Sequence, residues 1–592
     1  MLNEFGTLKE FKKLLYDSRD VRFKSPFGAA STRQKVSITF PVIETLKARS
    51  VSLFLRRNTR IKECVLEKKF NADGYDVFGT EFMTEREGTY FYRFEIYTES
   101  EVLYVGKGEG GKAIIGEWLP EWQLSVYQSA YRTADFIKGG VVYHIFCDRF
   151  CHAGSHVLPR YGILKDWNSD VTTRDPDGLY RANDFFGGNF KGIIEKLDYL
   201  SDLGVTALYL SPVFESSSNH RYDTADYSKI DPLLGSEDDF KDLIKECDDR
   251  GIAIILDGVF NHTGADSVYF NQLGHYNSIG ACQSKNSPYY DWYTFFNHPN
   301  EYLCWWGIGN VPTVARDAEG FRNLIAGENG IIEKWTKMGV RGWRLDVVDE
   351  LEGRFIDDIR RRVRACNSDG LIIGEVWEDA STKFSYGEEK EYFYGKELDG
   401  VMNYVYKEAI LEYVMTNNGK KFVETVLTIM ENYPVHTLDT CFTLLDSHDT
   451  VRVLNALSGV DGWKMSKEER RIYRLTDEQY EIAKKRVKFA SALQYFLPGV
   501  PSLYYGDEAG MQGFEDPINR RPYPWGKEDK DLIEHYKMLG MLRKNNRSDF
   551  IGSAVVRFDD GKVYVARGKL TLIANAEDCT FEIVINKKLS EY

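Results

Sequence analysis

The feature that most constrains the fold is a series of eight nearly continuous apolar segments separated by stretches with helical periodicity. These segments are residues 141–150, 204–212, 253–260, 342–348, 371–377, 399–406, 441–449 and 501–508. Strands buried on both faces of a parallel sheet have this continuous apolar character. Helical patterns follow near 193–203, 236–250, 330–338 and 354–366. Eight strands in this alternation predict an α/β fold, a (β/α)₈ TIM barrel over residues 141–546.

The regions outside the barrel strands have the pattern of β structure. Residues 1–127 contain short alternating runs such as VSITF and YFYRFEI, which predict an N-terminal β-sandwich. Residues 128–140 are expected to be a linker, and residues 547–592 predict a small C-terminal β domain. An irregular stretch follows the third strand and is too long for an ordinary loop, so an inserted subdomain is predicted at about 263–320.

Composition excludes several classes of function. The formal net charge of −14 has no long acidic run and argues against nucleic acid or an anionic membrane as partner. No apolar stretch approaches the ~20 residues that span a bilayer. Charges interrupt the N-terminal apolar positions, unlike a signal peptide. The nine cysteines show neither disulfide-framework nor zinc spacing, so we expect reduced thiols and a cytoplasmic location.

Ionisable residues cluster at the carboxyl ends of the predicted strands, where barrel chemistry takes place. They follow the third, fourth, fifth and seventh strands: Asp257, Asn261 and His262; Arg344 and Asp346; Glu375; His448 and Asp449. Burying several acids in one ring costs stability unless another interaction offsets it. A ring of four acids with an arginine and two histidines therefore predicts an active site.

Two of these acids fit glycoside cleavage with retention of configuration, which needs an ionised nucleophile opposite a protonated acid. Asp346 is the better nucleophile because Arg344, two residues earlier, favours its charged form. Glu375 lies between an apolar run and Trp377, where partial desolvation favours a protonated general acid. Asp449 would then hold sugar hydroxyls. For the two histidines taken singly, a structural role is an equal alternative.

Four segments, DGVFNH, GWRLDVVDE, GEVW and LLDSHD, resemble in order and spacing the signature regions of the α-amylase family of glycoside hydrolases (family 13). The segments VYHIFCDRF, SNHRYDTADY and LPGVPSLYYGDEAGM, the last followed by DPINRRPYPW, extend the resemblance over residues 141–545. Within that family the chain is most similar to the group of neopullulanases, cyclomaltodextrinases, maltogenic amylases and amylopullulanases.

The resemblance implies a role for each matching residue. Asp346 would be the nucleophile, Glu375 the acid/base and Asp449 the stabiliser of the transition state. The implied substrate-binding residues are Tyr222, Asp257, His262, Arg344, His448, Asp516 and Arg520. Structural or subsite roles would fall to Asn261, Trp305, Trp306 and Trp377. For the pair Trp305 and Trp306, core packing is an equal alternative.

The resemblance also implies a substrate, an α-glucan or malto-oligosaccharide. The expected activity is retaining hydrolysis of α-glucosidic bonds, mainly α-1,4 with α-1,6 open, in malto-oligosaccharides, cyclodextrins, pullulan or starch. An α-glucosidase or a glucanotransferase on the same fold is the alternative. A non-catalytic glucan-binding relative is a weaker one, because Asp346, Glu375 and Asp449 are all present.

Cofactor and partner expectations follow from the same comparison. No cofactor is expected. The calcium loop that relatives carry after the first strand reads CHAGSHV here, with Asn189 in place of an aspartate, so that calcium site is expected to be lost. The carbohydrate-binding-like sandwich is expected either to bind glucan or to close the active site as a dimer contact, and a purely stabilising role is an equal alternative, so a homodimer stays open. Its aromatic run, residues 118–127, is interpreted as interdomain packing rather than a sugar platform.

Overall fold

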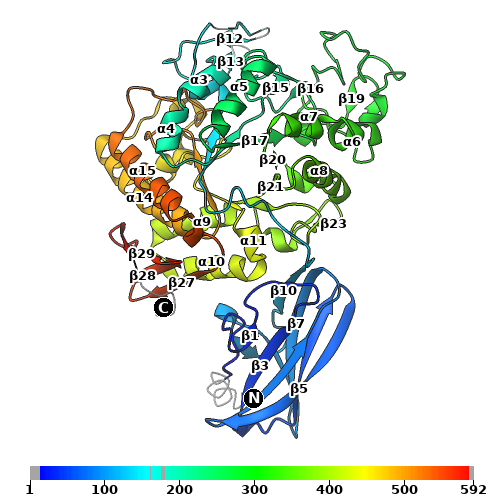
Figure 1. Ribbon diagram of the computed structural model, residues 1–592, viewed down its shortest axis with the longest axis vertical. Helices are drawn as coiled ribbons and strands as arrows, with labels where there is room; N and C mark the ends of the chain where they lie inside the picture. Colours follow the sequence, from blue (N-terminus) through cyan, green and yellow to red (C-terminus); the bar gives the residue numbers. More distant parts are fainter. Residues whose placement is uncertain (1–13, 156, 160–161, 175–180, 586–592) are drawn as a thin grey trace.

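The computed structural model describes residues 14–155, 157–159, 162–174 and 181–585. Figure 1 shows the barrel with its surrounding helices in the upper part of the molecule and an elongated β domain below it. A small sheet near the C-terminus lies against helices α10 (Gly419–Asn432) and α14 (Asp477–Phe496). The chain thus combines one helix-rich body with two β domains.

Eight parallel strands close into a barrel in sequence order. They are β11 (Val142–Ile145), β14 (Ala207–Leu210), β17 (Ala253–Gly258), β20 (Gly342–Leu345), β21 (Leu371–Val376), β24 (Gly400–Asn403), β25 (Phe442–Leu444) and β26 (Val500–Tyr504). Each strand lies in one of the eight predicted apolar segments or overlaps it, and every residue of these strands is buried. Alternate residues such as Tyr209, Ile255 and Met402 fill the interior of the barrel. The predicted barrel is confirmed.

Helices surround the barrel and bury their apolar faces against its strands. On α8 (Gly353–Cys366), Phe355, Ile356, Ile359 and Val363 recur at helical spacing and are buried. The remaining α-helices are α2 (Cys147–Phe150), α3 (Phe190–Glu195), α4 (Leu197–Asp202), α5 (Glu237–Asp248), α6 (Glu319–Ala326), α7 (Ile331–Met338), α9 (Tyr404–Thr416), α10 (Gly419–Asn432), α11 (Val435–Leu438), α12 (Val453–Ala456), α13 (Lys467–Ile472), α14 (Asp477–Phe496) and α15 (Lys530–Asn545). The single helix predicted near 193–203 is two short helices, α3 and α4, that meet at Lys196.

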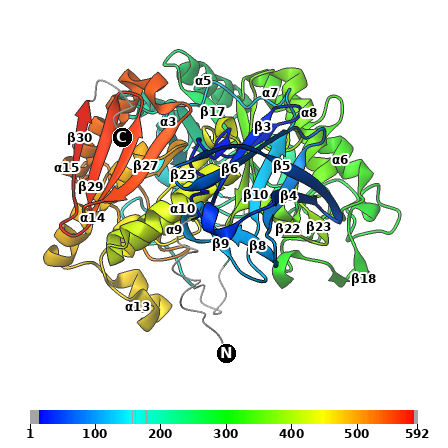
Figure 2. The same ribbon diagram turned by 90° about the horizontal axis from the view of Figure 1, so that it is seen from below.

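The N-terminal domain is a ten-stranded, mostly antiparallel β structure. Figure 2 shows the molecule from below, with this domain in front. Its strands are β1 (Lys24–Ser25), β2 (Ala30–Ser31), β3 (Val36–Ile43), β4 (Ser50–Arg57), β5 (Arg60–Ala72), β6 (Tyr75–Phe82), β7 (Gly88–Tyr97), β8 (Val102–Lys107), β9 (Ala113–Ile115) and β10 (Trp122–Tyr127). The long strand β5 pairs with β4 at one end and with β6 at the other, so it joins two layers around a separate apolar core. Trp122 is fully buried in that core and donates its indole N–H to Gly111 O at 2.8 Å.

The sandwich is tied to the barrel by polar contacts that involve both main chain and side chain. Ser125 Oγ donates to Asn432 O at 2.6 Å, and Arg19 pairs with Glu424 at 2.7 Å. The interdomain interpretation of the aromatic run 118–127 holds for Tyr127, whose ring lies 4.8 Å from that of His436. It is wrong for Trp122, which is buried in the core of the sandwich itself, and for Trp118, which is 99% exposed.

The C-terminal sheet is antiparallel and consists of β27 (Ala554–Asp559), β28 (Lys562–Arg567), β29 (Leu570–Asn575) and β30 (Thr580–Ile585). Its buried face, with Val563, Val565 and Leu572, continues the core of the helical layer. In the insert after β17, the short strands β18 (Phe295–Asn297) and β19 (Glu301–Tyr302) form a hairpin. No helix among the described residues is long and apolar enough to cross a membrane.

Candidate active site

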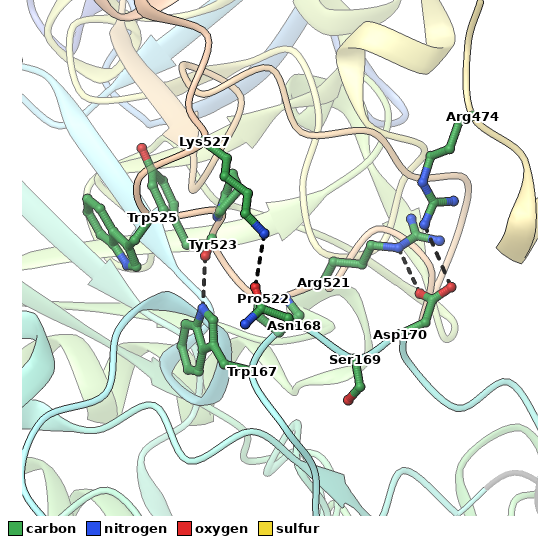
Figure 3. Close-up of a pocket in the computed structure, with 11 residues that line it drawn as sticks. Trp167, Asn168, Ser169, Asp170, Arg474, Arg521, Pro522, Tyr523, Trp525 and Lys527 are labelled. Carbon is green, nitrogen blue, oxygen red and sulfur yellow. Dashed lines mark hydrogen bonds and ion pairs between the residues drawn. The ribbon is translucent and has the colours of Figure 1, made fainter.

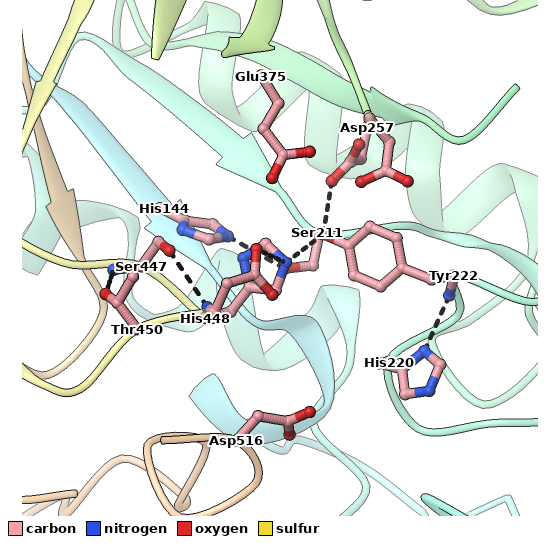
Figure 4. A network of polar contacts seen from close by, with 12 residues as sticks. His144, Ser211, His220, Tyr222, Asp257, Glu375, Ser447, His448, Thr450 and Asp516 are labelled. Atoms are coloured by element: carbon pink, nitrogen blue, oxygen red, sulfur yellow. Dashed lines mark hydrogen bonds and ion pairs between the residues drawn. The ribbon is translucent and has the colours of Figure 1, made fainter. Parts of the chain in front are cut away.

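A cavity of about 710 Å³ opens at the carboxyl ends of the barrel strands. Its lining includes most of the residues that the sequence singles out: Tyr222, His262, Trp305, Trp306, Asp346, Glu375, Trp377, His448, Asp449, Asp516 and Arg520. Asp257 and Arg344 lie directly beneath, fully buried. Closure of the barrel therefore brings together predicted side chains that are far apart in the sequence, from Tyr222 to Arg520. Figure 4 shows part of this network.

Arg344, at the end of β20, is the cation at the centre of the site. Its Nη1 donates to Asp257 at 2.8 and 3.0 Å and to Asp346 at 2.7 Å. Its Nη2 lies 3.0 Å from Glu375 Oε2. One guanidinium thus contacts three carboxylates, and the arrangement is possible because β17, β20 and β21 are adjacent in the barrel. The expected pairing of Arg344 with Asp346 is present, and a contact with Glu375 accompanies it.

Glu375, on β21, is held by two further donors. The main-chain N–H of Val347 donates to Oε2 at 2.9 Å, and the indole N–H of Trp377 donates to Oε1 at 3.1 Å. Trp377 in turn stacks on Tyr404 with the ring centroids 3.9 Å apart. Val347 has φ 38°, a left-handed conformation that a β-branched residue rarely adopts. The left-handed backbone of Val347, next to Asp346, therefore directs its N–H toward the carboxylate of Glu375.

The cleft contains more carboxyl groups than cationic side chains, and burial further disfavours the charged form of these carboxyl groups. Burial raises the pKa of Asp346 well above its ordinary range; Arg344 opposes the rise, and repulsion from Glu375 adds to it. Burial also raises the pKa of Asp449 to about 7, again with repulsion from Glu375 and opposition from Arg520. Because 32% of the Asp449 side chain is exposed to the cleft, solvent screens part of this effect. The cleft therefore tends to retain a proton among its carboxyl groups.

Tyr222 and the two histidines form one wall of the cleft. The Tyr222 hydroxyl donates to Asp257 Oδ2 at 2.8 Å, so at 2.6 Å it accepts from Nε2 of His448. The two rings stack with an interplanar angle of 6°. Burial lowers the pKa of His262 to about 4 and that of His448 well below its ordinary value. Both imidazoles are therefore neutral at pH 7 and can donate only one N–H each.

Asp449, Asp516 and Arg520 meet at one end of the cleft. Arg520 Nη2 lies 3.3 Å from Asp449 Oδ1, and Nη1 lies 2.9 Å from Asp516 Oδ1. Arg520 Nε also donates to the main-chain oxygen of His448 at 2.9 Å. These contacts fix the arginine between two carboxylates that face the cavity, an arrangement suited to gripping vicinal hydroxyls.

The insert is joined to the cleft through an acid that the sequence did not single out, Glu350. Glu350 Oε1 accepts from the indole N–H groups of Trp305 at 3.0 Å and of Trp306 at 3.3 Å. Its Oε2 accepts from Asn261 Nδ2 at 3.1 Å. Trp306 is 81% exposed, so the core-packing alternative is wrong for this residue. Glu350 is the last residue of the GWRLDVVDE segment. Its place in that segment was the only feature of the sequence that could have indicated that it contacts the insert.

Two more histidines near the cleft were also missed. His144, on β11, stacks on Tyr209 at 4.3 Å and lies within hydrogen-bonding distance of Ser211 Oγ, 3.2 Å. His220 Nδ1 accepts from the main-chain N–H of Tyr222 at 3.1 Å, as Figure 4 shows. Both histidines are in segments that the sequence comparison used, VYHIFCDRF and SNHRYDTADY.

A smaller cavity of about 190 Å³ is lined by residues that include Arg521, which follows Arg520 in the chain (Figure 3). Trp167 donates its indole N–H to Tyr523 O at 3.0 Å across it. Asp170 forms ion pairs with Arg521 at 2.9 Å and with Arg471 at 3.0 Å, so the negative charge of its carboxylate is balanced within the protein. These pairs brace the segment that carries Arg520.

No cluster of three histidine, cysteine or acidic side chains that could hold a metal occurs within the described ranges. In the loop after β11, Asn189 caps α3 by accepting from Gly192 N at 2.8 Å, and its amide donates to Ala153 O at 2.8 Å. His152 Nδ1 lies 2.7 Å from Gly187 O. The polar groups of this loop thus contact one another.

Comparison with known proteins places this geometry in a family. The family model described as alpha amylase, catalytic domain, matches residues 144–323 and 297–551, which is more than half of the chain. The chain belongs to the alpha-amylase family. The catalytic-domain match covers all eight barrel strands except the first two residues of β11, and it includes every residue that lines the cleft.

Relatives within the alpha-amylase family differ in length. The chain is 32% identical to an amylopullulanase of Thermoanaerobacter thermohydrosulfuricus over 98% of itself and 42% of that protein. It is 33% identical to neopullulanase 2 of Thermoactinomyces vulgaris, over 71% of itself and 66% of the relative. The solved type III pullulan hydrolase of Thermococcus kodakarensis matches with a TM-score of 0.65 at 25% identity, over 95% and 94% of the two chains. The chain spans half or less of the length of the amylopullulanases that it matches.

Proposed function

We propose that the protein hydrolyses α-glucosidic bonds of malto-oligosaccharides, cyclodextrins, pullulan or starch with retention of configuration. The observation that carries this proposal is the contact of Arg344 with both Asp346, at 2.7 Å, and Glu375, at 3.0 Å. A guanidinium that contacts both carboxylates keeps them near each other, in agreement with the short separation of a retaining pair. The names of relatives, including cyclomaltodextrinase and neopullulanase 2, support the substrate class.

The first step would be attack on the anomeric carbon. Asp346 forms a bond to that carbon while Glu375 delivers its proton to the departing glycosidic oxygen, which leaves as an alcohol. Arg344, 2.7 Å from Asp346, favours the ionised nucleophile. Glu375, left as a carboxylate, then accepts a proton from water, which attacks the glycosyl-enzyme ester and releases Asp346.

The remaining residues would bind the sugar ring. Asp449, 32% exposed into the cleft, is placed to accept from hydroxyls and to favour the flattened, positively charged transition state. His262 and His448, neutral at pH 7, border the same ring. The single N–H of each faces an oxygen of Tyr222, the main-chain oxygen for His262 and the hydroxyl for His448, so each would exchange that bond to donate to a sugar hydroxyl. Asp516 and Arg520 would hold the next sugar on the non-reducing side.

We also propose that the protein acts in the cytoplasm and needs no calcium in the loop after β11. All nine cysteines are free thiols, and one relative is an intracellular maltogenic amylase of Bacillus subtilis. Asn189 and His152 engage main-chain groups within that loop.

Product analysis on pullulan, β-cyclodextrin and soluble starch tests the function, with Glu375→Gln as the comparison. Panose from pullulan with rapid opening of β-cyclodextrin supports cleavage of α-1,4 bonds, and maltotriose from pullulan means α-1,6 cleavage. Transfer products with little hydrolysis would assign the protein to the glucanotransferases. Unchanged activity in Glu375→Gln would overturn the assignment of the acid/base.

A further inference from the structure

We propose that a groove outside the active-site cleft, between Trp167 and Arg474, binds the phosphoryl group of a small phosphomonoester. The groove consists of two adjoining cavities, of about 190 Å³ and about 460 Å³. Arg474, Arg521 and Lys527 line both cavities, and Figure 3 shows the smaller one. None of these three residues lines the active-site cleft, so the inference does not depend on the proposed function.

Cationic side chains exceed acidic ones in the lining of the smaller cavity. Arg521 Nε lies 2.9 Å from Asp170 Oδ1 and Arg474 Nη2 lies 3.7 Å from Asp170 Oδ2, so two guanidinium groups share one carboxylate. Arg471 also contacts Asp170, but it has a second partner in Glu468. The lining holds three cations and one acid, in a chain whose formal net charge is −14. A hollow lined by one sign of charge concentrates the field on a ligand of the opposite charge.

Two of these cations keep donors for a ligand. The ammonium of Lys527 lies 3.3 Å from Asn168 Oδ1 and pairs with no carboxylate among the described residues. Arg474 Nη1 donates to two main-chain oxygens at 2.9 and 2.8 Å, whereas its Nη2 is beyond hydrogen-bonding distance of Asp170. Burial and the repulsion of Arg474 lower the pKa of Arg521 to about 10, and a bound dianion would offset that repulsion. Charged donors of this kind form strong hydrogen bonds with phosphate oxygens.

The walls of the groove suit the organic part of such a ligand. The indole N–H of Trp167 donates to Tyr523 O at 3.0 Å, so its half-buried ring offers a ligand only apolar surface. The larger cavity adds Glu528 and Asp529, and Lys484 balances Asp529 at 3.0 Å. The carboxylate of Glu528 can accept from hydroxyl groups. A sugar phosphate combines the anion, the apolar ring face and the hydroxyl groups that these walls would bind.

Isothermal titration calorimetry of the full-length chain at low ionic strength tests the site with inorganic phosphate, glucose 1-phosphate and glucose. Arg474→Gln and Lys527→Gln are compared with Lys464→Gln, which also removes one positive charge but lies on the turn Gly462–Lys464. All three side chains are exposed, so each variant should keep the wild-type Tm. We expect both phosphoryl probes to bind the wild type, and glucose to give no heat that depends on Arg474 or Lys527.

Each groove variant should weaken the binding of both phosphoryl probes by about tenfold, because each loses a charged donor. The control should bind like the wild type, and added KCl should weaken binding. Tighter binding of glucose 1-phosphate than of inorganic phosphate would uphold the site and assign it to a sugar phosphate. Equal or tighter binding of inorganic phosphate would uphold the site and assign it to free phosphate.

Three results would overturn the proposal. The first is that neither phosphoryl probe binds the wild type. The second is that Arg474→Gln and Lys527→Gln bind both probes as tightly as the wild type does. The third is an equal loss of affinity in Lys464→Gln, because that result would show an effect of net charge alone.

Discussion

Glu350 joins the insert to the barrel, and replacing it with glutamine tests whether that junction supports substrate binding. The carboxylate accepts three N–H groups, from Trp305 at 3.0 Å, Trp306 at 3.3 Å and Asn261 at 3.1 Å. Glutamine keeps one acceptor oxygen for the two indoles but turns an N–H₂ toward Asn261. Hydrogen bonds to a charged group contribute about 1.5–3 kcal/mol and neutral ones about 0.5–1.5 kcal/mol, so the loss is about 1 kcal/mol for each of three bonds.

Solvent reduces that sum, because Trp306 is 81% exposed. We expect about 1.5–2 kcal/mol in total, or roughly a tenfold to thirtyfold rise in KM for maltoheptaose. The rise for maltotriose should be smaller, because a short substrate makes fewer contacts with the insert. The assay is steady-state kinetics on both substrates. Glu352→Gln is the matched control, since Glu352 pairs with Arg322 at 3.2 Å and does not line the cleft. Equal kinetics for Glu350→Gln and Glu352→Gln would refute the reasoning.

Three further predictions follow from the electrostatics of the protein. Asp449→Asn removes a negative neighbour that raises the pKa of Asp346. The acid limb of the pH profile of kcat/KM, measured with an activated aryl glucoside, should therefore move to lower pH by up to about one unit. An acid limb that stays in place would contradict the electrostatic interaction between Asp449 and Asp346. His535 is buried against Ser491, and burial lowers its pKa to about 4, compared with 6.5 in the unfolded chain. Its contribution to the free energy of unfolding is therefore complete above pH 6.5 and is lost as the pH falls toward 4. In urea titrations, His535→Gln should lose about 2 kcal/mol less free energy of unfolding between pH 7 and pH 5 than the wild type, and equal losses in the two proteins would refute this. Chelation by EDTA should leave Tm and activity unchanged, whereas a fall in Tm that added calcium restores would show a resident ion.

The barrel and the position of its site could be predicted because both depend on local patterns. A parallel strand buried on both faces is recognisable from its own residues, as in the segment of Ala253–Gly258. Barrel closure then places every strand end at one rim, so Asp257, Asp346 and Glu375 meet without further information.

What the sequence did not predict depends on backbone conformation and on the exposure of single side chains. The donation from Val347 N to Glu375 depends on a left-handed backbone that valine itself disfavours. Glu350 gains its role only because the insert folds back over β20, placing two indoles on one carboxylate oxygen. Trp118 and Trp122 are four residues apart in one aromatic run, yet one is fully exposed and the other fully buried, because β10 turns only the second into the core.

The central claim is that Asp346 forms the covalent intermediate of a retaining mechanism, and trapping that intermediate tests it most directly. The protein would be incubated with a fluorinated glucosyl fluoride, which slows the second step more than the first, and its peptides analysed by mass spectrometry. The account predicts a single glycosyl adduct on the peptide that contains Asp346, and none in Asp346→Asn. An adduct on another residue, or a product of inverted configuration with no adduct, would contradict it.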